Sequence, residues 1–69
     1  MEYTFVFEKP VDVVTFEAKT IYTALRELSQ YMIENKRFLC NLAPYYQTPK
    51  RSFLLKEIHI KFIEKELLI

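Results

Sequence analysis

The 69-residue sequence contains no glycine and no tryptophan. Glycine-rich phosphate loops need positive φ angles or a close approach of the backbone to phosphate, so the lack of glycine excludes that class of nucleotide site. Turns must instead be made by Pro, Asn, Asp or Ser. There is also only one cysteine, Cys40. A single cysteine excludes an internal disulfide framework and favours a reducing, cytoplasmic location.

Long apolar runs are absent as well. No stretch approaches the roughly 20 apolar residues of a membrane span, and the N-terminus lacks the basic segment and apolar core of a signal peptide. We therefore expect an intracellular protein with no membrane contact. The formal net charge is only +1, so overall charge does not favour any class of partner.

The residue constellations of catalysis and metal binding are also missing. The only histidine, His59, has Glu57 and Lys61 near it in sequence but no nucleophile or further metal ligand, so we expect a half-exposed structural histidine. Cys40 is flanked by leucine and asparagine, and we expect it to be buried and inert. The sequence therefore predicts a protein that is not an enzyme and that uses no cofactor or metal.

What is present is a high apolar and aromatic content in one short domain, residues 1–69. Hydrophobic residues make up 51% of the chain and aromatic residues 16%, which is enough for a globular core and argues against disorder. A chain of this length nevertheless buries only about 60% of its unfolded surface. Because a partner chain would supply more burial, we give a homodimer and a monomer equal weight.

The N-terminal part has the pattern of a β-hairpin. Residues 2–8 and 13–18 both alternate between apolar and other side chains, with a turn between them. A four-residue loop would place Phe7 opposite Val14 and Phe5 opposite Phe16. The apolar sets of both strands then lie on one side of the sheet.

Residues 20–35 predict the only clear helix. Thr20 is a suitable N-cap, and Lys36 with Arg37 closes the helix where cations suit its dipole. The apolar side chains that form a narrow stripe toward the hairpin are Ile21, Ala24, Leu25, Leu28 and Met32, with Tyr31 on the edge of the stripe.

Two apolar side chains of this helix, Tyr22 and Ile33, lie on a flank outside the stripe. Val6, Val13 and Leu55, expected on the far side of the sheet, likewise have no obvious core to join. Scattered exposure of this kind is normal. Taken together, however, these side chains are a candidate seam for a dimer or a protein partner.

The rest of the chain has weaker patterns. Residues 38–52 show no period, and their two prolines break any long element. The paired tyrosines favour an ordered loop over 44–51. Residues 53–63 fit a strand or a helix, and their partial alternation favours the strand. We therefore predict a small α+β domain, ββαβ-like, with a β-hairpin, one helix packed on it and at least one further C-terminal strand. The apolar residues 67–69 are expected to pack or pair.

Positive charge is concentrated between Asn35 and Lys56, where there are five bases and no acid. The candidate binding residues are Lys36, Arg37, Tyr45, Tyr46, Lys50 and Arg51. Tyrosine and arginine are favoured anchors in protein interfaces, whereas cations and aromatic rings also suit phosphates and unpaired bases. The plainest alternative is a solvated loop whose tyrosines cap the core.

In size, in its lack of glycine and in its lack of a catalytic motif, the chain resembles the short accessory proteins of phages and mobile elements. Some of those proteins inhibit host enzymes by binding them. The leading hypothesis is therefore a non-enzymatic protein-binding module, such as an inhibitor or adaptor. The alternative is a small nucleic-acid-binding protein that uses the basic, tyrosine-bearing segment 36–51.

Overall fold

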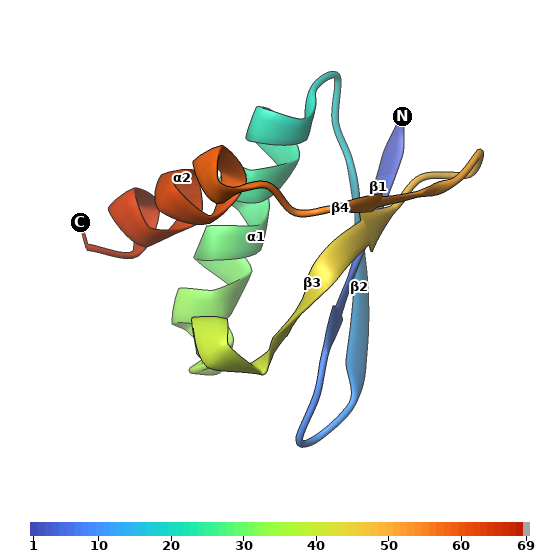
Figure 1. Ribbon diagram of the computed structural model, residues 1–69. Helices are drawn as coiled ribbons and strands as arrows, with labels where there is room; N and C mark the ends of the chain where they lie inside the picture. Colours follow the sequence, from blue (N-terminus) through green and yellow to red (C-terminus); the bar gives the residue numbers. More distant parts are fainter. Residues whose placement is uncertain (69) are drawn as a thin grey trace.

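The computed structural model describes residues 1–68. Its elements, in chain order, are β1 (Glu2–Phe7), β2 (Asp12–Glu17), α1 (Ile21–Asn35), the 3₁₀ turn η1 (Leu39–Asn41), β3 (Leu42–Gln47), β4 (Ser52–Leu54) and α2 (Glu57–Leu67). The strands form one antiparallel sheet in the order β2-β1-β3-β4. Both helices lie on the same side of the sheet (Figure 1). The predicted α+β fold is confirmed.

The core lies between the sheet and the two helices. Phe5 and Phe7 of β1 are fully buried beneath the predicted stripe of α1, of which Leu25 and Leu28 are also fully buried. Thr20 caps α1 as expected, since its Oγ1 accepts a hydrogen bond from a backbone N–H in the first turn at 3.3 Å. The stripe of α1 therefore covers the apolar face of the first hairpin.

The register of the first hairpin differs from the expected one by two residues. β2 begins at Asp12, so that Phe7 lies opposite Asp12 and Phe5 opposite Val14. Because the shift is even, the same side chains still face the core. The observed register brings the carboxylate of Asp12 under α1, where it accepts a hydrogen bond from the hydroxyl of Tyr31. That hydrogen bond raises the pKa of Tyr31, and desolvation adds to the effect.

The expected strand over residues 53–63 is wrong, because β4 ends at Leu54 and residues 57–67 form α2. The helical period was hidden by His59, a polar residue that is buried on the inner face of α2 next to Ile63. His59 Nδ1 accepts a hydrogen bond from the backbone N–H of Lys56 at 3.1 Å. The histidine therefore caps the first turn of α2 instead of standing half-exposed on a strand.

A second hairpin, β3–β4, occupies most of the segment expected to be a loop. Pro44 is tolerated near the point where the register between β1 and β3 shifts. Thr48 makes the tight turn without glycine: its Oγ1 accepts hydrogen bonds from the backbone N–H groups of Lys50 (3.3 Å) and Arg51 (3.4 Å). A side-chain oxygen therefore does what a glycine conformation often does in hairpins.

The α2 helix covers part of the flank of α1 that sequence patterns left without a partner. The ring centroid of Tyr22 lies 5.3 Å from that of Phe62 and 5.8 Å from that of His59. An ion pair between Arg26 Nε and Glu66 Oε1, at 3.5 Å, joins the same two helices. Tyr22 thus lies outside the stripe because it packs against α2, a second helix of the same chain.

Cys40 and the apolar C-terminus differ in part from their expected placement. Cys40 is exposed, not buried, because Leu39 takes the inward position of the short turn η1 and the next side chain turns outward. At the C-terminus, Leu67 is half-buried and Leu68 is exposed. The expected packing is therefore seen for Leu67 and not for Leu68. The third residue of that apolar end, Ile69, lies outside the described residues.

Candidate functional site

The β3–β4 hairpin carries four of the predicted binding residues. Tyr45 and Tyr46 are neighbours on β3, so their side chains point to opposite faces of the sheet. Tyr45 is half-exposed on the face away from the helices, and Tyr46 is buried on the helix side. Lys50 and Arg51 lie at the turn and are exposed. The predicted basic, tyrosine-bearing segment is therefore a hairpin with two different sides.

Tyr46 belongs to the core. Its ring stacks on that of Phe53, with the centroids 5.2 Å apart and the planes at 20°, and lies 6.1 Å from that of Phe5. Burial raises the pKa of its hydroxyl, and the nearby Tyr3 adds to the shift. Tyr46 therefore supports β4 from within and offers no free ring face to a base.

The sheet face opposite the helices, called here the open face, is uncharged over its centre. Alternation along the strands places eight side chains there, namely Thr4, Val6, Val13, Thr15, Tyr45, Gln47, Ser52 and Leu54. Leu54 is 75% exposed and Val13 59%. Acidic side chains occur only at one end of the face, where Glu2 and Glu17 are paired. Depletion of charge with retention of tyrosine is typical of interface cores.

The outer edge of β4 presents backbone groups for pairing. The N–H of Thr48 donates to the carbonyl of Arg51, and that of Leu55 to the carbonyl of Pro44, each at 2.9 Å. Hydrogen-bonded pairs alternate along antiparallel strands, so the N–H and C=O groups of residues 52 and 54 point away from β3. Since β4 is the last strand of the sheet, these groups are available to an added strand.

A hollow of about 330 Å³ lies beside this edge. It is lined by Tyr45, Gln47, Ser52, Phe53 and Leu54. The guanidinium carbon of Arg51 lies 5.6 Å from the ring centroid of Phe53, within range of a cation–π contact. The hairpin therefore combines an open backbone edge, an apolar hollow and two cations in one place.

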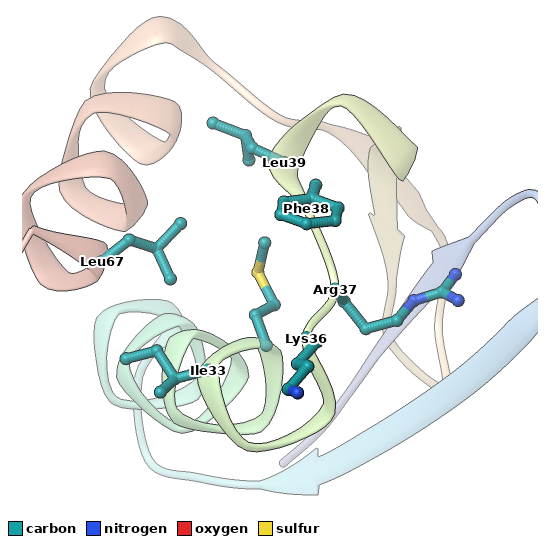
Figure 2. A pocket seen from close by; sticks show the side chains of 7 residues that line it. Ile33, Lys36, Arg37, Phe38, Leu39 and Leu67 are labelled. Atoms are coloured by element: carbon teal, nitrogen blue, oxygen red, sulfur yellow. The ribbon is translucent and has the colours of Figure 1, made fainter.

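A second hollow, of about 350 Å³, lies where α1 ends and is called here the α1-end hollow (Figure 2). It is lined by Met32, Ile33, Lys36, Arg37, Phe38, Leu39 and Leu67. In Figure 2 the side chains of Ile33, Leu67, Leu39 and Phe38 surround its centre, and Lys36 stands at its margin. Ile33 is 48% exposed, so this predicted seam residue borders the hollow.

Arg37 points away from the α1-end hollow, toward the first hairpin (Figure 2). Its Nη2 donates to the carbonyl of Pro10 at 2.8 Å, and its guanidinium carbon lies 4.8 Å from the ring centroid of Phe7. It therefore ties the end of α1 to the β1–β2 loop. The structure does not bring it near Lys50, because β3 pairs with Phe7 through one end and reaches the second turn at the other.

His59 stabilises the packing of α2 on α1 and the sheet. Its ring centroid lies 5.8 Å from that of Tyr22 and 6.0 Å from that of Tyr46. Burial, assisted by the charge of Lys56, lowers the pKa of His59. Within residues 1–68 no three His, Cys, Asp or Glu side chains gather where they could hold a metal ion.

Comparison of the chain with protein-family models, curated proteins and solved structures finds no match. In the described part of the chain, neither helix has the length and apolarity needed to cross a membrane. The function is therefore inferred from the geometry of the β3–β4 hairpin. The sequence pointed to Tyr45, Lys50 and Arg51 through charge and aromatic content, but it missed Ser52 and Leu54, whose role comes from being on the last strand.

Proposed function

We propose that this protein is a small, non-enzymatic protein-binding module, acting as an inhibitor or adaptor, that adds an extended segment of its partner to β4 as a further strand. The observation that carries the proposal is the outer edge of β4, where Ser52 and Leu54 present backbone groups beside an apolar hollow. The single cysteine favours a cytoplasmic setting.

The chemistry of the edge defines the partner segment. Backbone hydrogen bonds to residues 52 and 54 would each contribute about 0.5–1.5 kcal/mol. A partner side chain on the open face would cover Leu54, which is 75% exposed, and would contact Tyr45. Lys50 and Arg51 beside the edge favour Asp or Glu in the segment. We therefore expect an extended sequence that alternates apolar residues and carries acidic ones.

Selection from a random peptide library displayed on phage, with the immobilised chain as bait, tests this proposal. We expect enriched peptides to combine β-branched or aromatic residues at alternate positions with Asp or Glu. Enrichment of peptides without acidic residues or without alternation would contradict the proposal.

Two substitutions at one position separate the backbone from the side chain. Leu54→Ala keeps the outward N–H and removes the apolar contact, whereas Leu54→Pro removes the N–H itself, which edge strands tolerate. We expect the alanine variant to weaken peptide binding a few-fold and the proline variant to weaken it by about tenfold or more. Equal binding by the wild type and the proline variant would refute strand addition. Far-UV circular dichroism and the melting temperature serve as the control for folding of both variants.

A small nucleic-acid-binding protein is the second candidate. It is favoured by one observation: half-exposed Tyr45 lies on an open sheet face whose adjoining turn carries Lys50 and Arg51. A base stacked on the tyrosine would leave its phosphates near the cations. Labelled single-stranded and duplex DNA and RNA, titrated at about 50 mM and about 200 mM salt, test it. Binding that falls steeply with salt and is lost in Tyr45→Ala would support it, and no binding at the lower salt would exclude it.

A further inference from the structure

The two edges of the sheet run in opposite directions. All neighbouring strands in the order β2-β1-β3-β4 are antiparallel, so directions alternate and the even number of strands leaves β2 antiparallel to β4. A second copy shifted sideways in the plane of the sheet therefore brings its β2 antiparallel to β4 of the first. The helices of both copies remain on one side of the joined sheet, because they share one face (Figure 1).

The outer edge of β2 is as open as that of β4. The N–H of Ala18 donates to the carbonyl of Met1 at 3.0 Å, and the alternation of hydrogen-bonded pairs then turns the N–H and C=O groups of Val13, Thr15 and Glu17 outward. This strand is six residues long and contains no proline and no lysine. It therefore lacks the features that usually protect an edge from pairing.

We propose that copies of this protein assemble head to tail, with β4 of one copy paired to β2 of the next. The inference rests on the proposed function, because β4 is the same binding strand, and it names one occupant of that strand. Outward backbone groups must meet. Of the registers that allow this, the proposal takes the one that covers the exposed apolar side chains, with Leu54 opposite Val13 of the partner subunit and Ser52 opposite Thr15 of the partner subunit. The two most exposed apolar side chains of the open face, Leu54 at 75% and Val13 at 59%, thus cover each other.

Charge selects this arrangement over pairing of like edges. In the head-to-tail register Lys50 falls beside Glu17 of the partner subunit, whose side chain is 72% exposed although it also contacts the N-terminal ammonium at 2.8 Å. Two-fold pairing of β4 with β4, with Ser52 opposite Leu54 of the partner subunit, would instead place Lys50 opposite Lys56 of the partner subunit. Two-fold pairing of β2 with β2 would join strands whose charged residues are all acidic. Opposite charges favour the mixed pair, and like charges oppose the symmetric ones.

The contact is short and repeats. It offers about four backbone hydrogen bonds and one apolar pair on the open face, with Phe53 opposite Val14 of the partner subunit on the helix side. Because the interface joins two different edges, each added copy leaves an open edge at either end, and the twist of the sheet turns the growing assembly into a helical filament. Assembly should therefore be weak and should depend steeply on protein concentration.

Sedimentation velocity from about 10 µM to about 1 mM protein tests the proposal. We expect the weight-average mass of the wild type to rise continuously past that of a dimer at low salt. A chain that stays monomeric at the highest concentration overturns the proposal, and a plateau at the dimer mass overturns it in favour of two-fold pairing.

Variants that block one edge each provide the decisive control. Leu54→Pro removes the outward N–H of β4, and Val13→Pro removes that of β2. Each variant alone should remain monomeric, whereas their equimolar mixture retains one intact pair of edges and should stop at a heterodimer. If the mixture stays monomeric or grows past a dimer, the proposal is overturned.

Charge reversal separates this inference from the proposed function. Glu17→Lys should weaken assembly at least several-fold, and the double variant Glu17→Lys with Lys50→Glu should restore it, while Glu17→Lys leaves selected peptides bound to β4. A wild-type chain that binds such peptides but never assembles overturns the inference alone. Assembly that is lost in Leu54→Pro, without any peptide enrichment, overturns a foreign partner and supports self-assembly.

Discussion

Mild acidification should destabilise the fold through one buried imidazole. His59 is 7% exposed, and its Nδ1 accepts the hydrogen bond that closes the first turn of α2. Protonation of Nδ1 removes this acceptor and places a cation at a helix N-terminus, where the helix dipole opposes it. The structure therefore favours the neutral ring, and burial together with Lys56 lowers the pKa of His59 from its usual value of 6.5.

The direction of the pH effect follows from that lowered pKa. The histidine of the unfolded chain titrates near 6.5, so between this value and the lower folded pKa the unfolded state binds more protons. The free energy of unfolding then has its full value above about pH 7.5 and falls as the pH decreases from there toward the lowered pKa of His59 in the folded state. Urea unfolding followed by far-UV circular dichroism at several values between about pH 8 and about pH 5.5 measures it.

Two variants make the test specific to His59. Gln at this position of a helix can accept the same backbone hydrogen bond without titrating, so His59→Gln should keep most of the stability at about pH 8 and lose the slope. His59→Ala removes the cap, at a cost of about 1 kcal/mol, which is about 5 °C in melting temperature for a domain of this size. An identical slope in the wild type and in His59→Gln would refute the reasoning.

Three further outcomes test the packing of α2 and the C-terminal end of α1. Ile63→Ala, at a fully buried site of α2, should cost about 2–5 kcal/mol in urea unfolding, whereas Ile58→Ala on the exposed side of the same helix should change it by less than about 0.5 kcal/mol. Lys36→Gly should raise the melting temperature, because Lys36 closes α1 at φ 53°, where glycine is less strained by about 0.5–1 kcal/mol; a lower value would contradict this. Arg37→Lys keeps the charge but loses the hydrogen bond to the carbonyl of Pro10, so the free energy of unfolding in urea should fall by about 1–2 kcal/mol. An unchanged midpoint would show that this hydrogen bond does not stabilise the fold.

The first half of the fold was predictable because its side chains follow simple periods. Strict alternation marked β1, and the stripe with its Thr20 cap marked α1 to within one residue. The second half of the fold was not predictable in this way, because polar side chains there form local hydrogen bonds to the backbone that no sequence period reveals. His59 looks polar in sequence but is buried as a helix cap, and Thr48 closes a hairpin turn that contains no glycine.

The candidate site was predictable only in part, for a related reason. The excess of bases with tyrosine pointed to the segment that became the β3–β4 hairpin, and Lys50, Arg51 and Tyr45 remain in the proposal. Which backbone groups are open depends on the order of the strands in the sheet, and this is tertiary information that no local pattern carries. The same holds for Arg37, whose contacts lie on a loop far back in the chain.

Strand addition to β4 can be observed directly at the backbone. The amides of Ser52 and Leu54 point outward, whereas that of Phe53 lies between them and points toward β3. Hydrogen exchange of these amides, followed by ¹⁵N-resolved NMR with and without the most enriched peptide, is the most direct test of the proposed function. We expect slower exchange at Ser52 and Leu54 when the peptide is bound, with little change at Phe53. Unchanged exchange at both outward amides, or protection confined to Ile33 and Phe38 of the α1-end hollow, would contradict it.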